Sequence, residues 1–151
     1  MAIFIFAIMD IVFVFVGGIA SDRYGRRSLI FIANAIALII FYPSIYLVSP
    51  VEFTVIIAIF GVAHGLSYSP LVAFISEVFP TNMRYSGNSM SYQFGNAFIG
   101  GPAPYASDLL GTLLYSLYPL FTSAFIIIAF ATVISMKETK NRSLEVPSAE
   151  A

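Results

Sequence analysis

The sequence predicts an all-α membrane protein with five transmembrane helices. The chain of 151 residues is 59% hydrophobic and 10% charged, whereas soluble domains carry roughly 25% charged residues. Its apolar residues gather in five runs, each with about the 20 residues that a helix needs to cross a hydrocarbon core of roughly 30 Å. Because so little polar surface remains to cover a water-soluble globule, a membrane-embedded helical bundle is the expected fold class.

The five expected spans follow one another through short polar breaks. The first run contains one charge, Asp10, the second contains none, and Glu77 lies near the end of the third. The fourth run is the least apolar, and the fifth is among the most apolar. We expect the spans at residues 2–20, 29–48, 53–79, 86–106 and 113–136, which form one transmembrane region over 1–136, followed by a polar tail over 137–151.

The basic residues all fall on one side of such a five-span chain. Short loops rich in Lys and Arg stay cytoplasmic, because moving their charge across the bilayer during insertion is disfavoured. We therefore expect a multi-pass protein with its C-terminus in the cytoplasm. The basic residues are Arg23, Arg26 and Arg27 in the first break, Arg84 in the third, and Lys137, Lys140 and Arg142 in the tail.

The second and fourth breaks are expected to be turns on the opposite side of the membrane. They cover Ser49 to Glu52 and Ser107 to Thr112, and they contain no Lys or Arg. Five spans with the C-terminus inside would place Met1 outside, and the first span begins directly at this residue. We therefore expect the chain to be the C-terminal part of a longer protein.

The first break carries an ordered motif. A glycine in a tight turn between two spans supplies backbone freedom, and an acid with several arginines can form ion pairs or cap helix ends. Taken alone, these residues could form a positively charged anchoring loop. The ordered pattern G-x-x-x-D-R-x-G-R-R is narrower than that, and it resembles the loop signature of the major facilitator superfamily. It is formed by Gly18, Asp22, Arg23, Gly25, Arg26 and Arg27.

Further stretches carry the same resemblance. Residues 77–84 place an acid, a proline and an arginine at the inner end of the third span, and residues 138–145 look like the tail of sugar-porter-like members. Residues 84–104 resemble the metabolite:proton symporter branch. That branch includes permeases for dicarboxylates, citrate, shikimate and betaine-type solutes.

The resemblance implies an architecture and an activity. The five spans would be spans eight to twelve of a twelve-span transporter, and hence a partial six-helix half of a major facilitator fold. The implied activity is secondary active transport by alternating access, as proton-coupled symport of a small metabolite, either an organic acid or a zwitterionic solute. The implied location is the plasma membrane, here a bacterial inner membrane.

The resemblance also implies the partners. The proton gradient would be the driving force, without a bound cofactor. The partners would be the lipid bilayer, the small-molecule solute and a missing N-terminal transporter half, on the same full-length chain or on a separate polypeptide. No nucleic-acid partner is expected.

An inner gate is the expected role of the signature loop. In the family fold, two halves rock about a central site, and the signature loops close the inner face. The loop in this chain would form half of that closure. We expect Glu77 and Arg84, at the inner ends of adjacent spans, to join it in a charge network. The alternative is an anchoring loop whose salt bridges have little net value.

Two ionisable residues are expected inside the spans. Asp10 lies near the middle of the first span, where a charge costs at least ~2.5 kcal/mol, so it should face protein or water. Its expected role is proton coupling or substrate contact, and a structural ion pair or a hydrogen bond to the missing half is the alternative. His64 is at a similar depth with Tyr68 one turn away, and it is either part of this pathway or a hydrogen-bonded packing residue.

The third and fourth spans have features of moving helices. Gly61 and Gly65 form a close-packing pattern, and Pro70 is expected to kink the third span. Polar residues share one face of the fourth span, as expected where a helix lines a water-filled cavity, although interhelical hydrogen bonding is the alternative. These polar residues are Ser89, Gln93 and Asn96, and we expect the glycines and prolines within 100–104 to loosen the outer half of the span.

Two other function classes stand as alternatives. One is a five-span membrane interaction or assembly protein without transport activity of its own. The other, an intramembrane enzyme, is disfavoured because the chain has no cysteine, a single histidine and no Gly-x-Ser-x-Gly nucleophile motif. We therefore expect neither catalytic residues nor a metal site.

Overall fold

The computed structural model describes residues 1–46, 49–113 and 118–137, and every regular element in these ranges is helical. The all-α fold class is therefore confirmed. Residues 138–151, which hold most of the expected polar tail with Lys140 and Arg142, lie outside the described residues. The elements are α1 (Ala2–Tyr24), α2 (Arg26–Tyr46), α3 (Pro50–Val78), α4 (Arg84–Gly95), the π-helical turn η1 (Asn96–Gly100), α5 (Pro102–Leu113) and α6 (Tyr118–Ser135).

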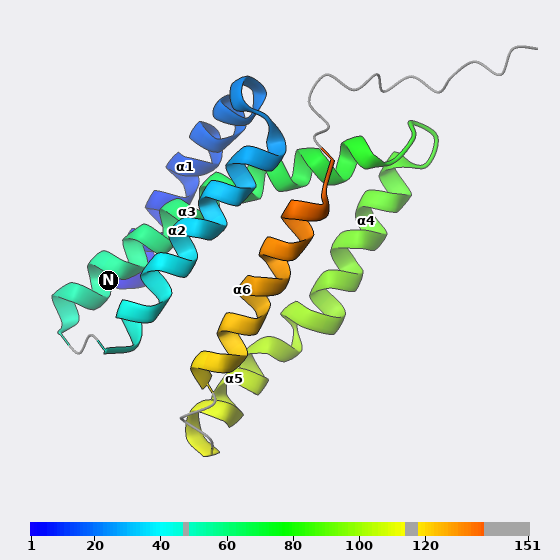
Figure 1. The fold of residues 1–151 in the computed structure, drawn as a ribbon. Helices are drawn as coiled ribbons and strands as arrows, with labels where there is room; N and C mark the ends of the chain where they lie inside the picture. Colours follow the sequence, from blue (N-terminus) through cyan, green and yellow to red (C-terminus); the bar gives the residue numbers. More distant parts are fainter. Residues whose placement is uncertain (47–48, 114–117, 138–151) are drawn as a thin grey trace, which may run out of the picture.

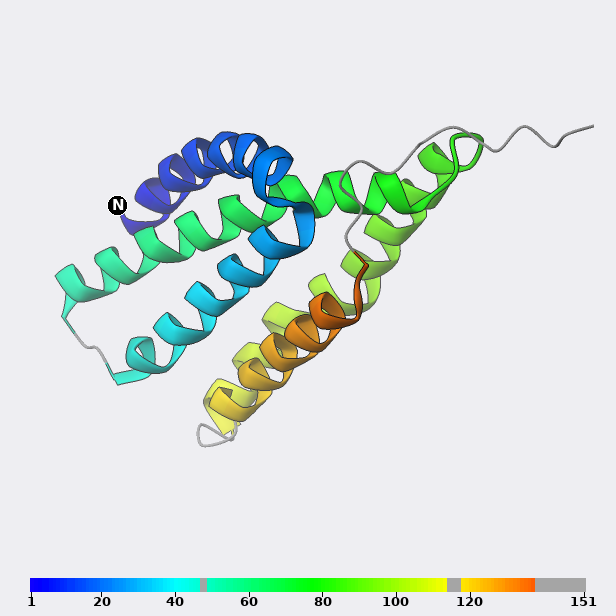
Figure 2. The same cartoon turned by 45° about the horizontal axis from the view of Figure 1, so that its top comes forward.

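The helices form two neighbouring groups (Figures 1 and 2). α1 and α2 both pack against α3 and against each other, which makes a three-helix group. α4 follows the end of α3 and continues through η1 into α5, and α6 then returns in contact with α5 and α2. The contacts between α2 and α6 and between α3 and α4 join the two groups.

Glycines allow α1 and α3 to approach closely. A Cβ atom on Gly65 would lie 2.6 Å from the carbonyl oxygen of Asp10, and one on Gly61 would lie 2.7 Å from that of Phe6. Gly17 of α1 packs in the same way against the backbone of α3. Small residues at such positions let helix backbones meet in a membrane. The close packing expected from Gly61 and Gly65 is therefore present, and α1 is the partner helix.

Three helices in the described part of the chain are long and apolar enough to cross a membrane, namely α1, α2 and α3. The fourth expected span differs from the prediction, because it is divided among α4, η1 and α5 with a break at Gly101. The apolar helix at residues 119–135 lies within the fifth expected span, whose residues 114–117 lie outside the described residues. Residues 100–104 explain the division, because glycine loosens a helix and proline lacks the N–H that a helix needs.

One turn contains the glycine that the sequence predicted, and another lies elsewhere. α1 continues to Tyr24, beyond the expected end of the first span, and the first break is a tight turn at the expected Gly25, whose φ of 98° favours glycine. Residues 107–112, predicted to be an outer turn, are helical and belong to α5. Polarity alone does not end a helix. This stretch contains no proline, and the Thr112 hydroxyl donates to the carbonyl oxygen of Asp108 within the helix.

α3 begins with a defined cap and bends along its length. Ser49 and Glu52 form a capping box, in which the Ser49 N–H donates to the Glu52 carboxylate at 3.3 Å, and Pro50 occupies the first helical position. Pro70 lies inside the helix and is buried. α3 changes direction along its course (Figure 1), as a proline within a helix is expected to cause.

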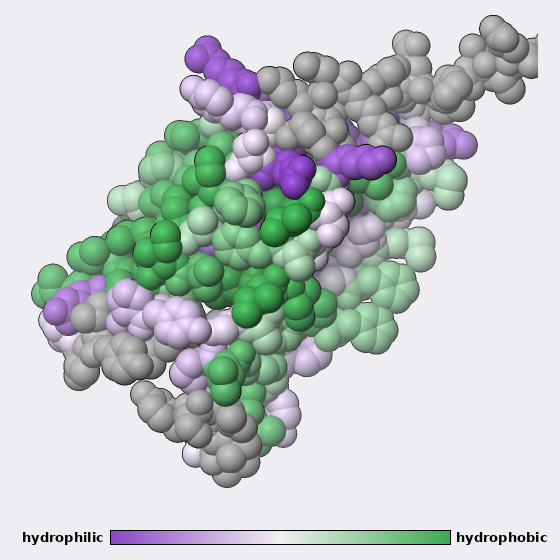
Figure 3. Space-filling model, viewed as in Figure 1, coloured by the Kyte–Doolittle hydropathy of each residue, from purple (hydrophilic) through white to green (hydrophobic). Residues whose placement is uncertain are grey.

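Apolar side chains cover most of the face shown in Figure 3, and polar residues gather mainly toward its two ends. Many large apolar residues on α1 and several on α2 are exposed, including Ile3 at 83%, Phe15 at 69% and Ile39 at 72%. A water-soluble monomer rarely exposes contiguous apolar surface of this extent. The surface therefore suits the hydrocarbon core of a membrane.

Candidate functional site

Arg26, the first residue of α2, joins three helices at the end of the bundle formed by residues 21–27, which we call the arginine end. Its guanidinium group donates to Asp22 of α1 at 2.5 Å and to Glu77 of α3 at 3.1 Å. The side chains of Arg26 and Glu77 are each 16% exposed, whereas Asp22 is largely exposed. The ion pair between Arg26 of α2 and Glu77 of α3 is therefore the less exposed of the two.

A glycine and a buried serine of α1 position this cluster. Arg26 also donates to the Ser21 hydroxyl, which donates to the carbonyl oxygen of Gly18 at 2.8 Å. Ser21 is fully buried, and a Cβ atom on Gly18 would lie 2.9 Å from Oγ of Ser69 on α3. Because Gly18 has no side chain, α1 can bring Ser21 and Asp22 close to the end of α3.

Arg27 connects the arginine end to the last helix. Its Nε donates to the carbonyl oxygen of Val133 at 3.1 Å, and its Nη2 donates to that of Ile134 at 2.8 Å. The last carbonyl groups of a helix have no partner within it, and a cation there also interacts favourably with the helix dipole. Sequence reasoning assigned Arg27 to the signature loop and did not foresee this contact, because nothing in the loop indicates which helix end lies beside it.

The other two arginines of the expected network also lie at helix ends. Arg23 is in the last turn of α1, and Arg84 is the first residue of α4 with its Nε buried. The structure thus places Asp22, Arg26 and Glu77 together in one cluster, with Arg27 next in the chain.

Asp10 and His64 face each other within the bundle. Oδ1 of Asp10 on α1 lies 2.9 Å from Nδ1 of His64 on α3. The side chains are 25% and 53% exposed, respectively, so both remain accessible. The close approach of α1 to Gly65 brings the Asp10 backbone against α3 one residue from His64. In the described ranges of the chain, no three His, Asp or Glu side chains are placed to hold a metal ion.

Aromatic rings surround the imidazole of His64. The Tyr68 ring stacks on it with a centroid separation of 5.6 Å and an interplanar angle of 26°. The Phe6 ring of α1 lies at 5.9 Å in a tilted arrangement. An imidazole in this position can hydrogen-bond to Asp10 when neutral, and it forms an ion pair with Asp10 when protonated.

A hollow of about 240 Å³ separates α3 from α4 and holds several of the predicted residues. Tyr68, Ser89 and Gln93 all line it, and sequence reasoning had placed each of them in a substrate or proton pathway. Tyr92 lines the same hollow from α4, one helical turn before Asn96 at the start of η1. The remaining lining residues are Val72, Ile75 and Asn88.

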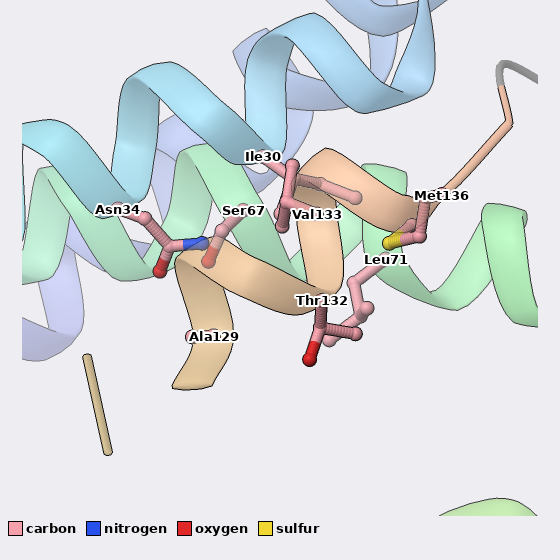
Figure 4. A pocket seen from close by; sticks show the side chains of 8 residues that line it. All are labelled: Ile30, Asn34, Ser67, Leu71, Ala129, Thr132, Val133 and Met136. Carbon is pink, nitrogen blue, oxygen red and sulfur yellow. The ribbon is translucent and has the colours of Figure 1, made fainter. Parts of the chain in front are cut away.

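A second hollow, of about 220 Å³, lies between α2, α3 and α6 (Figure 4). Its walls are mostly aliphatic, with Asn34, Ser67 and Thr132 as the polar members. A neighbouring hollow of about 190 Å³ shares Asn34 and Ser67 and is also lined by His64. These two hollows run along the face where α2 meets α3.

Several lining residues were missed by sequence reasoning. Asn88 and Tyr92 lie one turn apart on α4, beside the polar face that the sequence indicated, and Asn34 is a single amide in an otherwise apolar span. Isolated polar residues in apolar segments often mark functional positions, and this signal was available in the sequence. They were not selected because the helical pattern does not show which faces meet across a hollow.

Comparisons with known proteins give a consistent result. The family model described as "Sugar (and other) transporter" matches residues 1–149. The inner membrane metabolite transport protein YhjE of Escherichia coli K12 is 31% identical over 85% of this chain and 30% of its own length. The ectoine/proline transporter ProP of Corynebacterium glutamicum is 29% identical over 94% of this chain and 32% of its own length. The citrate-proton symporter of Klebsiella pneumoniae is 28% identical over 63% of this chain and 22% of its own length.

The chain therefore spans about a third or less of the length of these relatives. No solved structure gives a significant match to it. The all-helical fold and the apolar outer surface are those of a multi-pass membrane protein. With the match over residues 1–149, they show that the chain belongs to the sugar (and other) transporter family of the major facilitator superfamily.

Proposed function

We propose that this chain is part of a proton-coupled transporter, which carries a small organic acid or zwitterionic solute across the membrane by alternating access. The proton gradient supplies the driving force, and no bound cofactor takes part. The names of the relatives support this proposal, since they include a citrate-proton symporter and an ectoine/proline transporter.

The pair formed by Asp10 and His64 is the observation that carries the proposal. Ionisable groups inside apolar helices are costly and usually mark ion or proton pathways. The 2.9 Å contact gives each group a partner, and the partial exposure of both side chains lets protons reach them. Histidine changes its charge near neutral pH, so this pair suits proton uptake and release during a transport cycle.

The ion pairs of Arg26 support a gate at the arginine end. Two unit charges about 4 Å apart interact by roughly 4 kcal/mol at an effective dielectric constant near 20, before desolvation is subtracted. Making and breaking the contact between Arg26 and Glu77 is therefore large enough to bias a two-state gate. Asp22 adds a second carboxylate, and Arg23 and Arg84 add positive charge at nearby helix ends.

The proposal includes a second transporter half and an orientation. The relatives are about three times as long as this chain or longer, so the remaining half would come from the same polypeptide or from a separate one. In this proposal the arginine end and the C-terminus lie in the cytoplasm, because short loops rich in Lys and Arg usually remain inside. The relatives favour a bacterial inner membrane.

Transport measurements on the intact protein test the proposal. The protein, purified through a C-terminal tag introduced at the native locus, is placed in liposomes that contain a pH-sensitive dye. Citrate, proline and ectoine are then added in turn. We expect one of these solutes, or a close analogue, to drive proton entry, and we expect Asp10→Asn to abolish that entry.

Asp108→Asn is the matched control, because it makes the same chemical change on α5, away from His64. It should leave proton entry intact. Unchanged proton coupling in Asp10→Asn would remove Asp10 from the proton pathway. If the tagged protein carries no solute and instead co-purifies with an unrelated membrane complex, the chain is an interaction protein.

A further inference from the structure

We propose that two hollows beside α2 form one path for water between His64 and the arginine end, with Asn34 and Ser67 as positioning residues for the waters that carry the proton. This inference rests on the proposed function in one respect, namely that His64 takes up and releases protons during transport. It adds the side on which the proton leaves, and it assigns roles to two polar residues outside the predicted pathway.

The first hollow begins at the proton site. It has a volume of about 190 Å³ and lies between α2 and α3, with His64, Ser67 and Asn34 among its lining residues. Ser67 follows His64 by three residues, so it lies on the same face of α3, about 4.5 Å further along the helix axis. The Ser67 hydroxyl donates to the carbonyl oxygen of His64 at 3.1 Å, and its own oxygen can still accept a hydrogen bond from water.

The second hollow continues from two of the same residues. Its volume is about 220 Å³, Asn34 and Ser67 line it as well, and residues between 129 and 136 form the wall opposite α2 and α3. Figure 4 shows the Asn34 and Ser67 side chains next to each other, with Met136 toward the other end of the hollow. Because Asn34 and Ser67 belong to both walls, the two hollows adjoin at these side chains.

The second hollow ends beside the arginine end. Val133 is one of its lining residues, and the carbonyl oxygen of Val133 accepts the hydrogen bond from Nε of Arg27. The Arg27 guanidinium also donates to the carbonyl oxygen of Ile134, so its charge is held by the end of α6. A proton that leaves His64 in this direction reaches the side that the basic residues predict to be cytoplasmic, as proton-driven uptake requires.

The hollows have both the room and the hydrogen-bonding groups that water needs. A water molecule takes up about 30 Å³ in the liquid and needs two to four polar partners inside a protein, so each hollow has room for several. The partners along the path are the Ser67 hydroxyl, the Asn34 amide and the Thr132 hydroxyl, which donates to the carbonyl oxygen of Ile128 and can still accept. Since the other walls are mostly aliphatic, the waters depend on these groups.

Thiol labelling tests whether water reaches the point where the two hollows adjoin. Ser67→Cys places a thiol there with little change in shape, and Ile39→Cys places a reference thiol on the apolar surface of α2, where the side chain is 72% exposed. Each variant is made in the full protein with no other cysteine. Membrane vesicles of both orientations are treated with an anionic methanethiosulfonate that cannot cross the membrane, and Tyr24→Cys identifies the vesicles whose arginine end faces the reagent.

We expect the reagent, applied at the arginine end, to modify Ser67→Cys at least about tenfold faster than Ile39→Cys, because a charged molecule is strongly disfavoured in the hydrocarbon core. Adding Ala129→Phe, which places a ring in the second hollow, should slow the reaction of Ser67→Cys by a similar factor. Ala131→Phe is the matched control, because it makes the same change at an exposed position of the same helix that does not line the hollow. It should leave the labelling rate unchanged.

Proton entry driven by citrate, proline or ectoine tests the same path during transport. Asn34→Leu removes the amide that lines both hollows, and Thr132→Val removes a hydroxyl group while keeping its shape. Each should slow proton entry about fivefold, the factor that corresponds to one hydrogen bond, whereas exchange of labelled solute for unlabelled solute, which releases no net proton, should keep its rate. A general packing defect would slow both. Thr54→Val is the matched control, since Thr54 makes the same 2.8 Å hydrogen bond to the carbonyl oxygen four residues earlier but lines neither hollow.

The inference is overturned if the anionic reagent does not reach Ser67→Cys from the arginine end, or reaches it equally fast from the opposite side. Labelling by a lipid-soluble maleimide alone would mean that the hollows are filled from the hydrocarbon core, which also overturns it, as would parent rates of proton entry in both Asn34→Leu and Thr132→Val. Failure of this inference is distinct from failure of the proposed function. Solute-driven proton entry with an unreactive Ser67→Cys would leave the transporter assignment standing and remove the path.

Discussion

At the scale of single residues, Arg26 illustrates how the signature loop works. The loop motif indicated that charges would gather between the first two spans, and Glu77 was the acid expected to meet them. The structure places Glu77 against Arg26, which also binds Asp22 and the buried Ser21. The sequence did not show that Arg26, among the three arginines of the loop, would make this contact.

Replacing Glu77 tests the ion pair between α2 and α3. Glu77→Gln keeps the shape of the side chain but removes its charge, and Arg26 is then left with Asp22 as its remaining carboxylate partner in this cluster. Because both side chains are mostly buried, we expect a loss of about 1–3 kcal/mol in stability. The thermal unfolding midpoint in detergent measures this loss.

Glu52→Gln is the control for that experiment. It makes the same chemical change at the exposed start of α3, where glutamine also serves in a capping box. Its unfolding midpoint should match that of the parent protein. Equal midpoints for Glu77→Gln and the parent protein would mean that the ion pair adds no net stability.

At the scale of the elements, the packing of α1 on α3 positions the proton site. Gly61, Gly65 and Gly17 remove the side chains that would keep the two backbones apart. Asp10 and His64 can then meet across the interface. The glycine pattern predicted a close helix contact, but the partner helix was decided by the three-dimensional packing.

Gly65→Ala should separate α1 from α3. The added methyl group would lie 2.6 Å from the carbonyl oxygen of Asp10, so the helices must shift. Overpacking of this kind costs about 1–3 kcal/mol, so the unfolding midpoint in detergent should fall. The shift of the helices should also lengthen the contact between Asp10 and His64. Solute-driven proton entry should also decrease in this variant.

Gly111→Ala provides the comparison, since nothing lies within 4 Å of the position that its methyl group would take on α5. Alanine also favours a helix over glycine by up to about 1 kcal/mol. Its stability should equal or exceed that of the parent protein. If Gly65→Ala and Gly111→Ala behave alike, the helix contact is not what limits stability.

The fourth helical region behaves differently from a regular span. Its polar face and its glycines and prolines indicated a loosened cavity-lining helix, and the structure divides it into α4, η1 and α5. The π-helical turn is closed by the Gly101 N–H, which donates to the carbonyl oxygen of Asn96. Such turns often occur at functional sites, and this one starts where the α3–α4 hollow ends.

At the scale of the whole molecule, the distribution of charge predicts which end of the bundle faces the cytoplasm. The arginine end carries the α1–α2 turn, and Arg27 brings the end of α6 to the same place. The start of α3 lies at the opposite end of the bundle (Figure 1). These positions agree with a chain that crosses the membrane repeatedly, with its basic residues on one side.

Single cysteines test this orientation in whole cells. Tyr24→Cys lies at the arginine end and Ser49→Cys lies at the start of α3. A maleimide that cannot cross the membrane should label Ser49→Cys in intact cells and should label Tyr24→Cys only after the cells are opened, because loops rich in Lys and Arg remain inside. The reverse pattern would invert the proposed orientation.

By itself, the sequence determined the fold class, the membrane environment and the family, and it predicts a sidedness from its charges. These properties follow from composition, from the length of apolar runs and from an ordered local motif, all of which can be read without knowing how the helices pack. The positions of α1, α2 and α3 were also predicted to within a few residues.

Only the tertiary structure decided which side chains meet. Arg26 and Glu77 are 51 positions apart, Asp10 and His64 are 54 apart, and Arg27 and Val133 are 106 apart. Contacts over such separations depend on which helix faces pack together, and helical periodicity identifies a polar face without identifying its partner. For the same reason, the role of Arg27 at the end of α6 became visible only in the folded chain.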